Sequence, residues 1–207
     1  MRDAAVVLLT LNEVEGLRAM WDRLPHGAFA EMFAVDGGST DGTQELLSER
    51  GVPFVVQPIR GRGVAFRVAA EASRAERLIF FSPDGNEDPD DIARLDDLLL
   101  AGADLAIARR FGPGAVNEED GEALRLRARV NDTLSQVANR LFHRGDRVYD
   151  TINGFRALRR QALLDLATTV KRFPIEYQIT ILAMQRGWRI AELPTREGQR
   201  IGGERKA

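Results

Sequence analysis

Short apolar runs alternate with longer amphipathic stretches along the first half of the chain. The apolar runs are brief, rich in β-branched or aromatic residues and bounded by Gly, Pro or Asp, which indicates buried strands. They cover Ala4–Leu9, Met32–Val35, Phe54–Gln57, Leu78–Phe81 and Asp104–Ala108. The stretches between them predict helices over Glu13–Arg23, Thr40–Arg50, Val64–Ala75 and Asp90–Ala101. This alternation predicts βαβ units and an α/β fold with a mostly parallel sheet flanked by helices.

Three polar loops follow strands of this predicted sheet, over Thr10–Glu13, Asp36–Asp41 and Ser82–Asp88. Ligands of parallel α/β sheets bind beyond the carboxyl ends of the strands. We therefore expect these loops to line one cleft.

The second half of the chain has a different pattern. Phe111–Gly121 is a loop rich in glycine and acidic residues, Pro174–Gln185 predicts a helix, and Trp188–Leu193 predicts a last strand. The tail Arg200–Ala207 carries glycine and charges and is expected to be flexible. No repeat, low-complexity tract or linker interrupts the sequence, so we predict a single domain over residues 1–207.

A long helix is predicted over Leu124–Phe142. One stripe of it is apolar and consists of Val130, Leu134, Val137, Ala138 and Leu141. We interpret the stripe as a face that packs on the core. The alternative is a basic amphipathic helix that lies on a membrane, because Arg125, Arg129 and Arg140 flank the stripe.

Composition and charge narrow the possible functions. The chain has 207 residues, a formal net charge of −2, no cysteine and two histidines, His26 and His143. A disulfide framework, a thiolate zinc site, a cysteine nucleophile and a global basic field for nucleic acid are excluded. Ser82–Asp104 holds eight acidic residues against one arginine, whereas Glu122–Arg160 holds nine arginines against four acidic residues. This asymmetry suits a site that holds a metal and phosphates; two solvated helix faces are the alternative.

Targeting signals are weak in this sequence. No apolar run reaches the roughly 18 residues that span a bilayer, and the start MRDAAVVLLTLNE has too short an apolar run for a signal peptide. We expect a cytoplasmic protein, with peripheral contact at the inner face of the membrane still open.

The stretch VDGGSTDGT, residues 35–43, carries the most chemical information. A predicted strand ends in Asp36, and the following glycines let the backbone approach a ligand closely. Ser39 or Thr40 can cap the next helix, whose N-terminus favours anions. A carboxylate at this position can accept hydrogen bonds from a base or ribose. A turn followed by a capped helix explains the stretch equally well when it is taken alone.

Further motifs occur with it in a fixed order. TLNEVEGL, VDGGSTDGT, GRGVAFRVAAE, the acidic loop after FF, and DTINGFRALRR together resemble family 2 nucleotide-sugar glycosyltransferases with a GT-A fold. Within this family the chain is most similar to the branch of polyprenyl-phosphate (dolichyl-phosphate) mannose and glucose synthases. The resemblance covers nearly the whole chain, to about Lys206. The resemblance implies a Rossmann-like GT-A domain, with residues 1–110 as the nucleotide-sugar and metal half and residues 111–207 as the acceptor half.

The resemblance also implies roles for residues of the donor half. Those that match donor-binding positions are Thr10, Asn12, Glu13, Asp36, Gly38 and Arg62. The family's usual Asp-X-Asp, which holds Mg²⁺ or Mn²⁺ against the donor diphosphate, corresponds to Ser82-Pro83-Asp84. Asp84 is then the expected metal ligand and a catalytic residue, with Asn86 completing the site. One carboxylate suffices for a hard cation that keeps waters and phosphate oxygens.

The acceptor half is expected to be basic. Arg110, Arg156 and Arg200 match positions that contact acceptor or phosphate groups. Asp150 is expected near the reacting centre, with an orienting or a catalytic role. Glu176 is a weaker candidate for a base. Arg156 could instead be an ordinary surface arginine.

The implied reaction is inverting transfer of a sugar from a GDP- or UDP-sugar to a polyprenyl phosphate, dependent on Mg²⁺ or Mn²⁺. The metal and arginines stabilise the leaving diphosphate. One alternative is transfer to a soluble hydroxyl acceptor, which requires a base. The other is a nucleotide-sugar binding protein without catalysis, because Gly37 and Ser82 replace usual acids.

Overall fold

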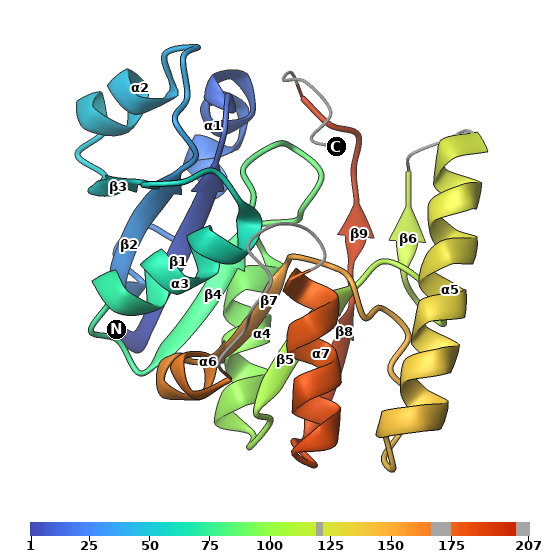
Figure 1. Cartoon of the computed structure of the whole chain (residues 1–207). Coiled ribbons are helices and arrows are strands. Elements are labelled where there is room, and N and C mark those ends of the chain that lie inside the picture. The colour runs from blue at the N-terminus through green and yellow to red at the C-terminus, as the bar shows by residue number, and fades with distance from the viewer. Residues whose placement is uncertain (119–121, 167–174, 202–207) are drawn as a thin grey trace.

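A seven-stranded sheet forms the centre of the computed structural model (Figure 1), which describes residues 1–118, 122–166 and 175–201. Its strand order is β3-β2-β1-β4-β7-β5-β8. The strands are β1 (Arg2–Thr10), β2 (Phe29–Asp36), β3 (Phe54–Val56), β4 (Arg77–Phe81), β5 (Leu105–Arg109), β7 (Arg156–Arg159) and β8 (Ile190–Pro194). All neighbouring pairs are parallel except those of β7, which runs antiparallel to both β4 and β5.

Helices cover both faces of the sheet (Figure 1). One face packs against α1 (Val14–Met20), α2 (Thr43–Glu49) and α4 (Asp91–Leu100), and the other against α3 (Arg62–Ala72), α6 (Arg160–Asp165), α7 (Ile175–Gln185) and part of α5 (Glu122–Phe142). Strand β1 contributes side chains to the core on both faces of the sheet. Successive residues alternate between the two core clusters: Ala5, Val7 and Leu9 belong to one, and Ala4, Val6 and Leu8 belong to the other. A strand buried on both faces reads as a continuous apolar run.

The predicted α/β fold with a mostly parallel sheet is therefore confirmed. The helix expected over Glu13–Arg23 is divided into α1 and the 3-10 helix η1 (Trp21–Arg23). Strand β7 and helix α6 were not predicted. A second, two-stranded sheet of β6 (Val116–Asn117) and β9 (Arg196–Glu197) lies partly within the expected loop Phe111–Gly121, whose last residues, 119–121, are outside the described part.

Strand β7 matters for the site because of its direction. An antiparallel strand begins at the edge where its parallel neighbours end. The residues just before β7, including Asp150, therefore reach the same edge of the sheet as the loops that follow β4 and β5. This arrangement joins the two halves of the chain that the sequence assigned to donor and acceptor.

Helix α5 lies at the side of the molecule, and its apolar stripe does not pack on the core as we expected (Figure 1). Ala138 is buried, but Val130, Val137 and Leu141 are exposed. The reason is that α5 packs through polar side chains, which bond to the backbone of Val148 and Tyr149.

The C-terminal segment crosses the carboxyl edge of the sheet. The backbone N–H of Gly198 donates to the carbonyl of Asn86 at 2.8 Å, and that of Ile201 donates to the carbonyl of Asp84 at 2.8 Å. The expected flexible tail thus begins with an anchored segment at Arg200 and Ile201; residues 202–207 lie outside the described part.

Candidate functional site

The loops after β1 and β2 bond to each other and form one unit. The backbone N–H of Asn12 donates to Ser39 Oγ at 2.9 Å, and Asn12 Oδ1 accepts from the N–H of Thr40 at 2.9 Å. The N–H of Glu13 donates to Thr43 Oγ1 at 3.0 Å. Three predicted donor-binding residues, Asn12, Glu13 and their neighbour Thr10, thus lie beside the VDGGSTDGT turn.

Asp36 is fully buried at the centre of this unit. Its carboxylate accepts hydrogen bonds from Thr10 Oγ1 at 2.8 Å, from Gln44 Nε2 at 2.7 Å, and from the backbone N–H groups of Gly38 and Ser39 at 2.9 and 2.8 Å. Burial opposes its ionisation, but these bonds, those from Ser39 foremost, hold the pKa of Asp36 below its usual range. The charge therefore fixes the shape of the loop, and its predicted contact with a nucleotide stays a prediction.

An arginine that we did not predict covers the same turn. Arg60 Nε donates to the carbonyl of Gly37 at 2.9 Å, and Arg60 Nη2 donates to that of Gly38 at 3.0 Å. Gly38 has a φ of 87°, a left-handed conformation that suits glycine. The pattern in the sequence gave no signal for Arg60, because it lies just outside the GRG motif.

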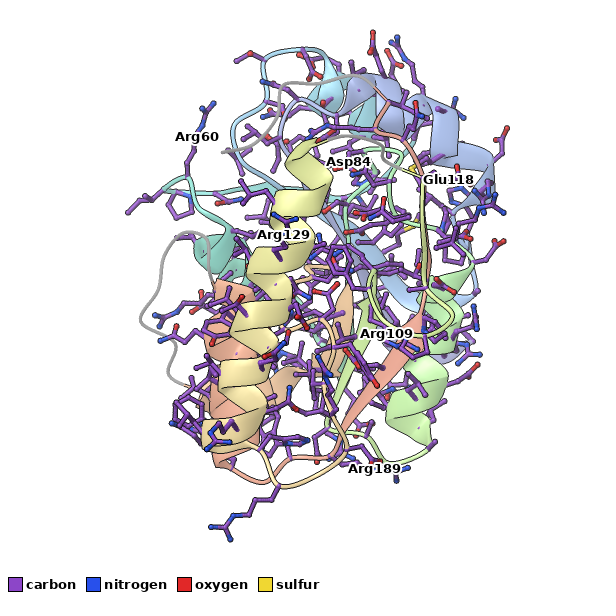
Figure 2. The ribbon with its side chains drawn as sticks, turned by 90° about the vertical axis from the view of Figure 1, so that its right-hand side faces the viewer. Arg60, Asp84, Arg109, Glu118, Arg129 and Arg189 are labelled. Atoms are coloured by element: carbon purple, nitrogen blue, oxygen red, sulfur yellow. The ribbon has the colours of Figure 1, made fainter. Side chains whose placement is uncertain are left out.

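The loop with Asp84 follows β4 and lies directly under α1. A Cβ on Gly16 would come within 2.9 Å of Asp84 Cα, so glycine is what allows the helix to approach this loop. The carboxylate of Asp84 accepts the N–H of Asn86 at 3.2 Å. Asn86 Oδ1 and Ser82 Oγ are buried and have no partner among the described residues. Figure 2 shows Asp84 near one end of the molecule and Arg189 near the other.

Glu87 adds a further carboxylate that the sequence analysis did not single out. It accepts the N–H of Ser82 at 2.6 Å. Burial, followed by repulsion from Asp84, raises the pKa of Glu87 to about 8, and Glu197 adds to this effect. Burial and the repulsion between the carboxylates therefore outweigh the nearby positive charge of Arg62 and the hydrogen bond from Ser82.

The remaining acids of this segment lie at or just before the start of α4. Asp88 and Asp90 pair with Arg23 at 2.5 and 3.2 Å, and Asp91 accepts from Thr195 Oγ1 at 2.5 Å. Acidic side chains at a helix start suit the dipole of the helix.

A divalent cation fits the residues at Asp84, although the described part of the chain holds no cluster of three or more acidic, histidine or cysteine side chains for a metal. The fit rests on the carboxylate of Asp84 and on the buried, unpartnered Oδ1 of Asn86. Both are hard oxygen ligands, which Mg²⁺ and Mn²⁺ prefer. Magnesium keeps several waters and needs only one or two carboxylates when phosphates supply further oxygens.

Arg110 and Asp150 form a buried ion pair on the other side of the edge. Arg110 donates to Asp150 Oδ2 from Nε at 2.8 Å and from its backbone N–H at 3.0 Å, and to Oδ1 from Nη2 at 3.1 Å. Burial opposes both charges, but their mutual attraction outweighs it, lowering the pKa of Asp150 and raising that of Arg110. Asp150 also accepts the N–H of Asn153 at 3.1 Å. A carboxylate so engaged is suited to orient Arg110 and poorly suited to accept a proton.

Glu192 on β8 binds the backbone of the loop that carries Asp150. Its carboxylate accepts the N–H of Tyr149 at 2.9 Å and that of Asp150 at 2.8 Å. Burial raises the pKa of Glu192 to about 7, even though these two bonds favour the ionised form. No pattern in the sequence indicated this residue, because a glutamate in a strand is expected to be exposed to solvent.

We expect Glu192→Gln to remove a pH dependence of folding. The folded-state pKa of about 7 exceeds the ordinary glutamate pKa of 4.5, so the folded protein binds more protons than the unfolded chain between these pH values. This contribution is fully present below about pH 4.5 and is lost as pH rises through about 7. After a discount for the partial solvent exposure of Glu192, its contribution to the free energy of unfolding is roughly 2 kcal/mol.

Urea denaturation at several values from about pH 5 to about pH 8 measures this contribution. The free energy of unfolding should fall with rising pH more steeply for the wild-type chain than for Glu192→Gln. Parallel curves for the two proteins would contradict the assignment.

Arg156 is not placed for its predicted role in binding acceptor phosphate, nor is it a surface arginine. Its side chain is fully buried. Its guanidinium donates to the carbonyls of Asn153 and Glu176 and to Thr180 Oγ1. Burial lowers the pKa of Arg156 to about 10. Arg156 therefore ties the loop before β7 to α7, and it supports the site from within the core.

Arg62 and Glu176 form an ion pair that connects α3 with the start of α7. Glu176 is buried, and its Oε2 has no partner among the described residues. A Cβ on Gly154 would collide with the guanidinium of Arg62, so this glycine leaves the space that the arginine occupies. The pair brings the GRG segment of the donor half against the DTINGFR segment of the acceptor half.

Arg200 lies on the donor side of the site rather than beside Arg110. Its Nη2 donates to Glu13 Oε1 at 2.9 Å, and both side chains are largely buried. Together with the bonds from Gly198 and Ile201, this pair holds the C-terminal segment across the Asp84 loop. The site is thus covered by a segment that is distant in sequence.

Comparison with known proteins gives a consistent assignment. Residues 5–166 match the profile of Glycosyl transferase family 2. The chain is 32% identical to the glycosyltransferase AglJ of Haloferax volcanii over 93% of its own length, and it spans 62% of that relative. It is 30% identical to the dolichyl-phosphate hexose transferase of the same organism, covering 97% of this chain and 85% of the relative. Identity to the polyprenol monophosphomannose synthase of Mycolicibacterium smegmatis is 29%, with coverages of 91% and 75%.

Solved structures agree on the fold. Glucosyl-3-phosphoglycerate synthase from Mycobacterium tuberculosis, in complex with Mn²⁺, UDP and glucosyl-3-phosphoglycerate, superposes with a TM-score of 0.76. The match covers 98% of this chain and 73% of the synthase at 21% identity. At that identity the likeness supports the GT-A architecture, and the ligands named belong to the synthase.

Proposed function

This chain belongs to glycosyltransferase family 2 and is a glycosyltransferase, and we propose that it transfers a sugar from a GDP- or UDP-sugar to a polyprenyl phosphate. The proposal includes inversion at the anomeric carbon and dependence on Mg²⁺ or Mn²⁺. Relatives named for dolichyl-phosphate hexose transfer and polyprenol monophosphomannose synthesis support the acceptor class.

The donor half contributes the residues that stabilise the leaving group. Asp84 and Asn86 would hold the divalent ion, which when bound neutralises charge on the donor diphosphate. The interlocked loops with Asn12 and Asp36 would take the nucleoside, and the anchored segment at Arg200 closes over the diphosphate and excludes water. Fixed positive charge stabilises a leaving group as its negative charge grows.

One observation in the acceptor half supports the proposal most directly, namely the buried ion pair of Arg110 and Asp150. A polyprenyl phosphate is already an anion at neutral pH and needs no strong base, only a cation that positions it. Asp150 holds the guanidinium of Arg110 in a fixed orientation, and its low pKa makes it a poor base. A single displacement from the face opposite the diphosphate then inverts the sugar without a covalent enzyme intermediate.

One observation favours a second acceptor class. Oε2 of Glu176 is buried without a partner among the described residues, so it is one carboxylate oxygen with room to accept a proton from an acceptor. A hydroxyl acceptor would require such a base within hydrogen-bond reach. Glu176→Gln would then abolish transfer, whereas transfer to a phosphate acceptor would depend on it only through the pair with Arg62.

A two-step assay tests the proposal. First, GDP- and UDP-sugars are screened with and without Mn²⁺ by thermal unfolding, where the true donor at about a hundred times its Kd should raise Tm by about 5 °C or more. Second, transfer of labelled sugar is compared among a polyprenyl phosphate, the matching polyprenol and a soluble phosphorylated acceptor.

The proposal predicts metal-dependent binding of one donor and transfer to the polyprenyl phosphate alone. Transfer to the polyprenol would show a hydroxyl acceptor. Binding without any turnover would indicate a nucleotide-sugar binding protein.

A further inference from the structure

Helix α5 has its polarity inverted relative to a helix that packs on a core. Four apolar side chains face outward: Leu126 is 64% exposed, Val130 46%, Val137 44% and Leu141 64%. At about 100° per residue they fall within roughly 60° of arc, and the row is about 22 Å long. We call these four residues the outer stripe. An ordinary surface helix exposes its polar face and buries its apolar one.

Polar side chains on the inner face of α5 bond to the loop before β7. Asn131 Nδ2 donates to the carbonyl of Tyr149 at 2.8 Å, and Ser135 Oγ donates to the same oxygen at 3.1 Å. Asn139 donates to the carbonyl of Val148 at 2.8 Å and accepts its N–H at 2.9 Å. Because rotation of the helix would break all of these bonds, the outer stripe cannot turn inward within this fold.

The charge beside the outer stripe is positive in the described part of the helix. Arg129 and Arg140 are exposed and lie along one border of the stripe. Figure 2 views the molecule from the side where α5 lies, with Arg129 labelled on that helix. Asp132, farther around the helix, is engaged by Arg147 at 2.9 Å and by Gln136 at 2.7 Å. A second copy of the chain would bring such arginines against each other, whereas an anionic surface would neutralise them.

The lower end of the outer stripe opens onto a cavity of about 1020 Å³. Leu141 of the outer stripe and its neighbour Arg140 line this cavity, and the wall continues with Arg144, Arg186 and Trp188. Arginine binds phosphate oxygens well, and tryptophan is enriched where a membrane meets water. This cavity is therefore suited to phospholipid head groups.

We propose that the outer stripe and its flanking arginines seat α5 on an anionic membrane surface. The apolar side chains enter the boundary of the acyl chains, and Arg129 and Arg140 contact lipid phosphates. This inference rests on the proposed function in one respect, because it identifies the membrane as the source of a polyprenyl-phosphate acceptor.

The inner face of the same helix explains what docking achieves. The loop that it holds contains Asp150, which in turn orients Arg110. A membrane under α5 would therefore lie at a fixed position relative to the guanidinium that positions the acceptor phosphate. Docking would bring a membrane-borne acceptor to the site. None of the helices in the described ranges combines the length and apolar character needed to cross one.

Flotation of the full chain with vesicles, without donor or acceptor, tests the surface. Vesicles of phosphatidylcholine alone are compared with vesicles that also contain phosphatidylglycerol. We expect binding to the anionic vesicles, a loss of about a hundredfold in Leu126→Ser/Leu141→Ser, and a loss of about thirtyfold in Arg129→Gln/Arg140→Gln. Leu100→Ser and Arg67→Gln are the matched controls, because both residues are exposed on other helices. Circular dichroism checks that each variant is folded.

Several results would overturn the proposal: no binding by the wild-type chain, equal binding to neutral vesicles, or stripe variants that bind as the controls do. A dimer in analytical ultracentrifugation that the leucine variant converts to monomer would assign the stripe to a second copy instead.

Transfer assays separate this inference from the proposed function. If both hold, the leucine variant loses transfer to a vesicle-borne polyprenyl phosphate relative to a short-chain soluble one. Vesicle binding without transfer to either acceptor would reject the proposed function and leave the docking surface standing. Transfer to both acceptors without vesicle binding would reject only the docking surface.

Discussion

Asp84→Asn should lower metal-dependent kcat/KM by about a thousandfold while leaving the fold intact. The substitution keeps the size of the side chain and an oxygen that can accept the N–H of Asn86, but it removes the charge that attracts a divalent ion. Metal stabilisation of a leaving diphosphate amounts to several kcal/mol, and each 1.36 kcal/mol is a factor of ten in rate. Steady-state kinetics over a range of Mn²⁺ concentrations measure the effect.

Asp90→Asn is the matched control, because Asp90 is an exposed acid six residues further along the same segment and pairs with Arg23. It should retain wild-type dependence on the metal. The Mn²⁺-dependent rise of Tm with donor should vanish in Asp84→Asn and persist in Asp90→Asn. Full turnover in Asp84→Asn would remove the metal assignment and with it the proposed chemistry of the donor half.

The part of the fold that the sequence predicted correctly is the part in which local pattern and tertiary environment agree. Strands β1, β2, β4 and β5 are covered by helices on both faces, so their sequences are continuous apolar runs. Strand β7 was missed because its sequence, Arg-Ala-Leu-Arg, gives no such run. Its place in the centre of the sheet depends on Arg156, whose buried guanidinium donates to the carbonyls of Asn153 in the preceding loop and Glu176 in α7, two segments that local sequence cannot bring together.

The candidate site likewise has a part that the sequence could predict and a part that it could not. The loops after β1, β2 and β4 were predictable, because the carboxyl ends of parallel strands share an edge. The ion pairs of Arg200 with Glu13 and of Arg62 with Glu176 join segments more than a hundred residues apart, and no spacing rule indicates them. For helix α5 the local pattern was visible, but its orientation was not. Its apolar stripe was visible in the sequence, but the hydrogen bonds between its polar side chains and the backbone of the facing loop decide whether the stripe points inward or outward.

Arg110→Ala should raise the KM for a phosphate acceptor by about a hundredfold while the donor KM changes less than about twofold. A charge-assisted contact to phosphate accounts for about 2–3 kcal/mol, which corresponds to that factor. The substitution also leaves Asp150 buried without its cation, which costs about 3–5 kcal/mol of folding free energy. Arg94→Ala is the control for such a loss, because Arg94 pairs with the buried carboxylate of Asp91 on α4.

Asp150→Asn separates orientation from proton transfer at the same pair. The amide keeps an oxygen for the backbone N–H of Asn153, so the loop can hold its shape while Arg110 loses its ionic partner. If Asp150 orients Arg110, the variant raises the acceptor KM and leaves the pH profile of kcat unchanged. If Asp150 were the base, kcat would fall by about a hundredfold or more and the acidic limb of the profile would disappear. The buried pair predicts the first result, because a carboxylate whose pKa is lowered by an adjacent guanidinium has little affinity for the proton of an acceptor.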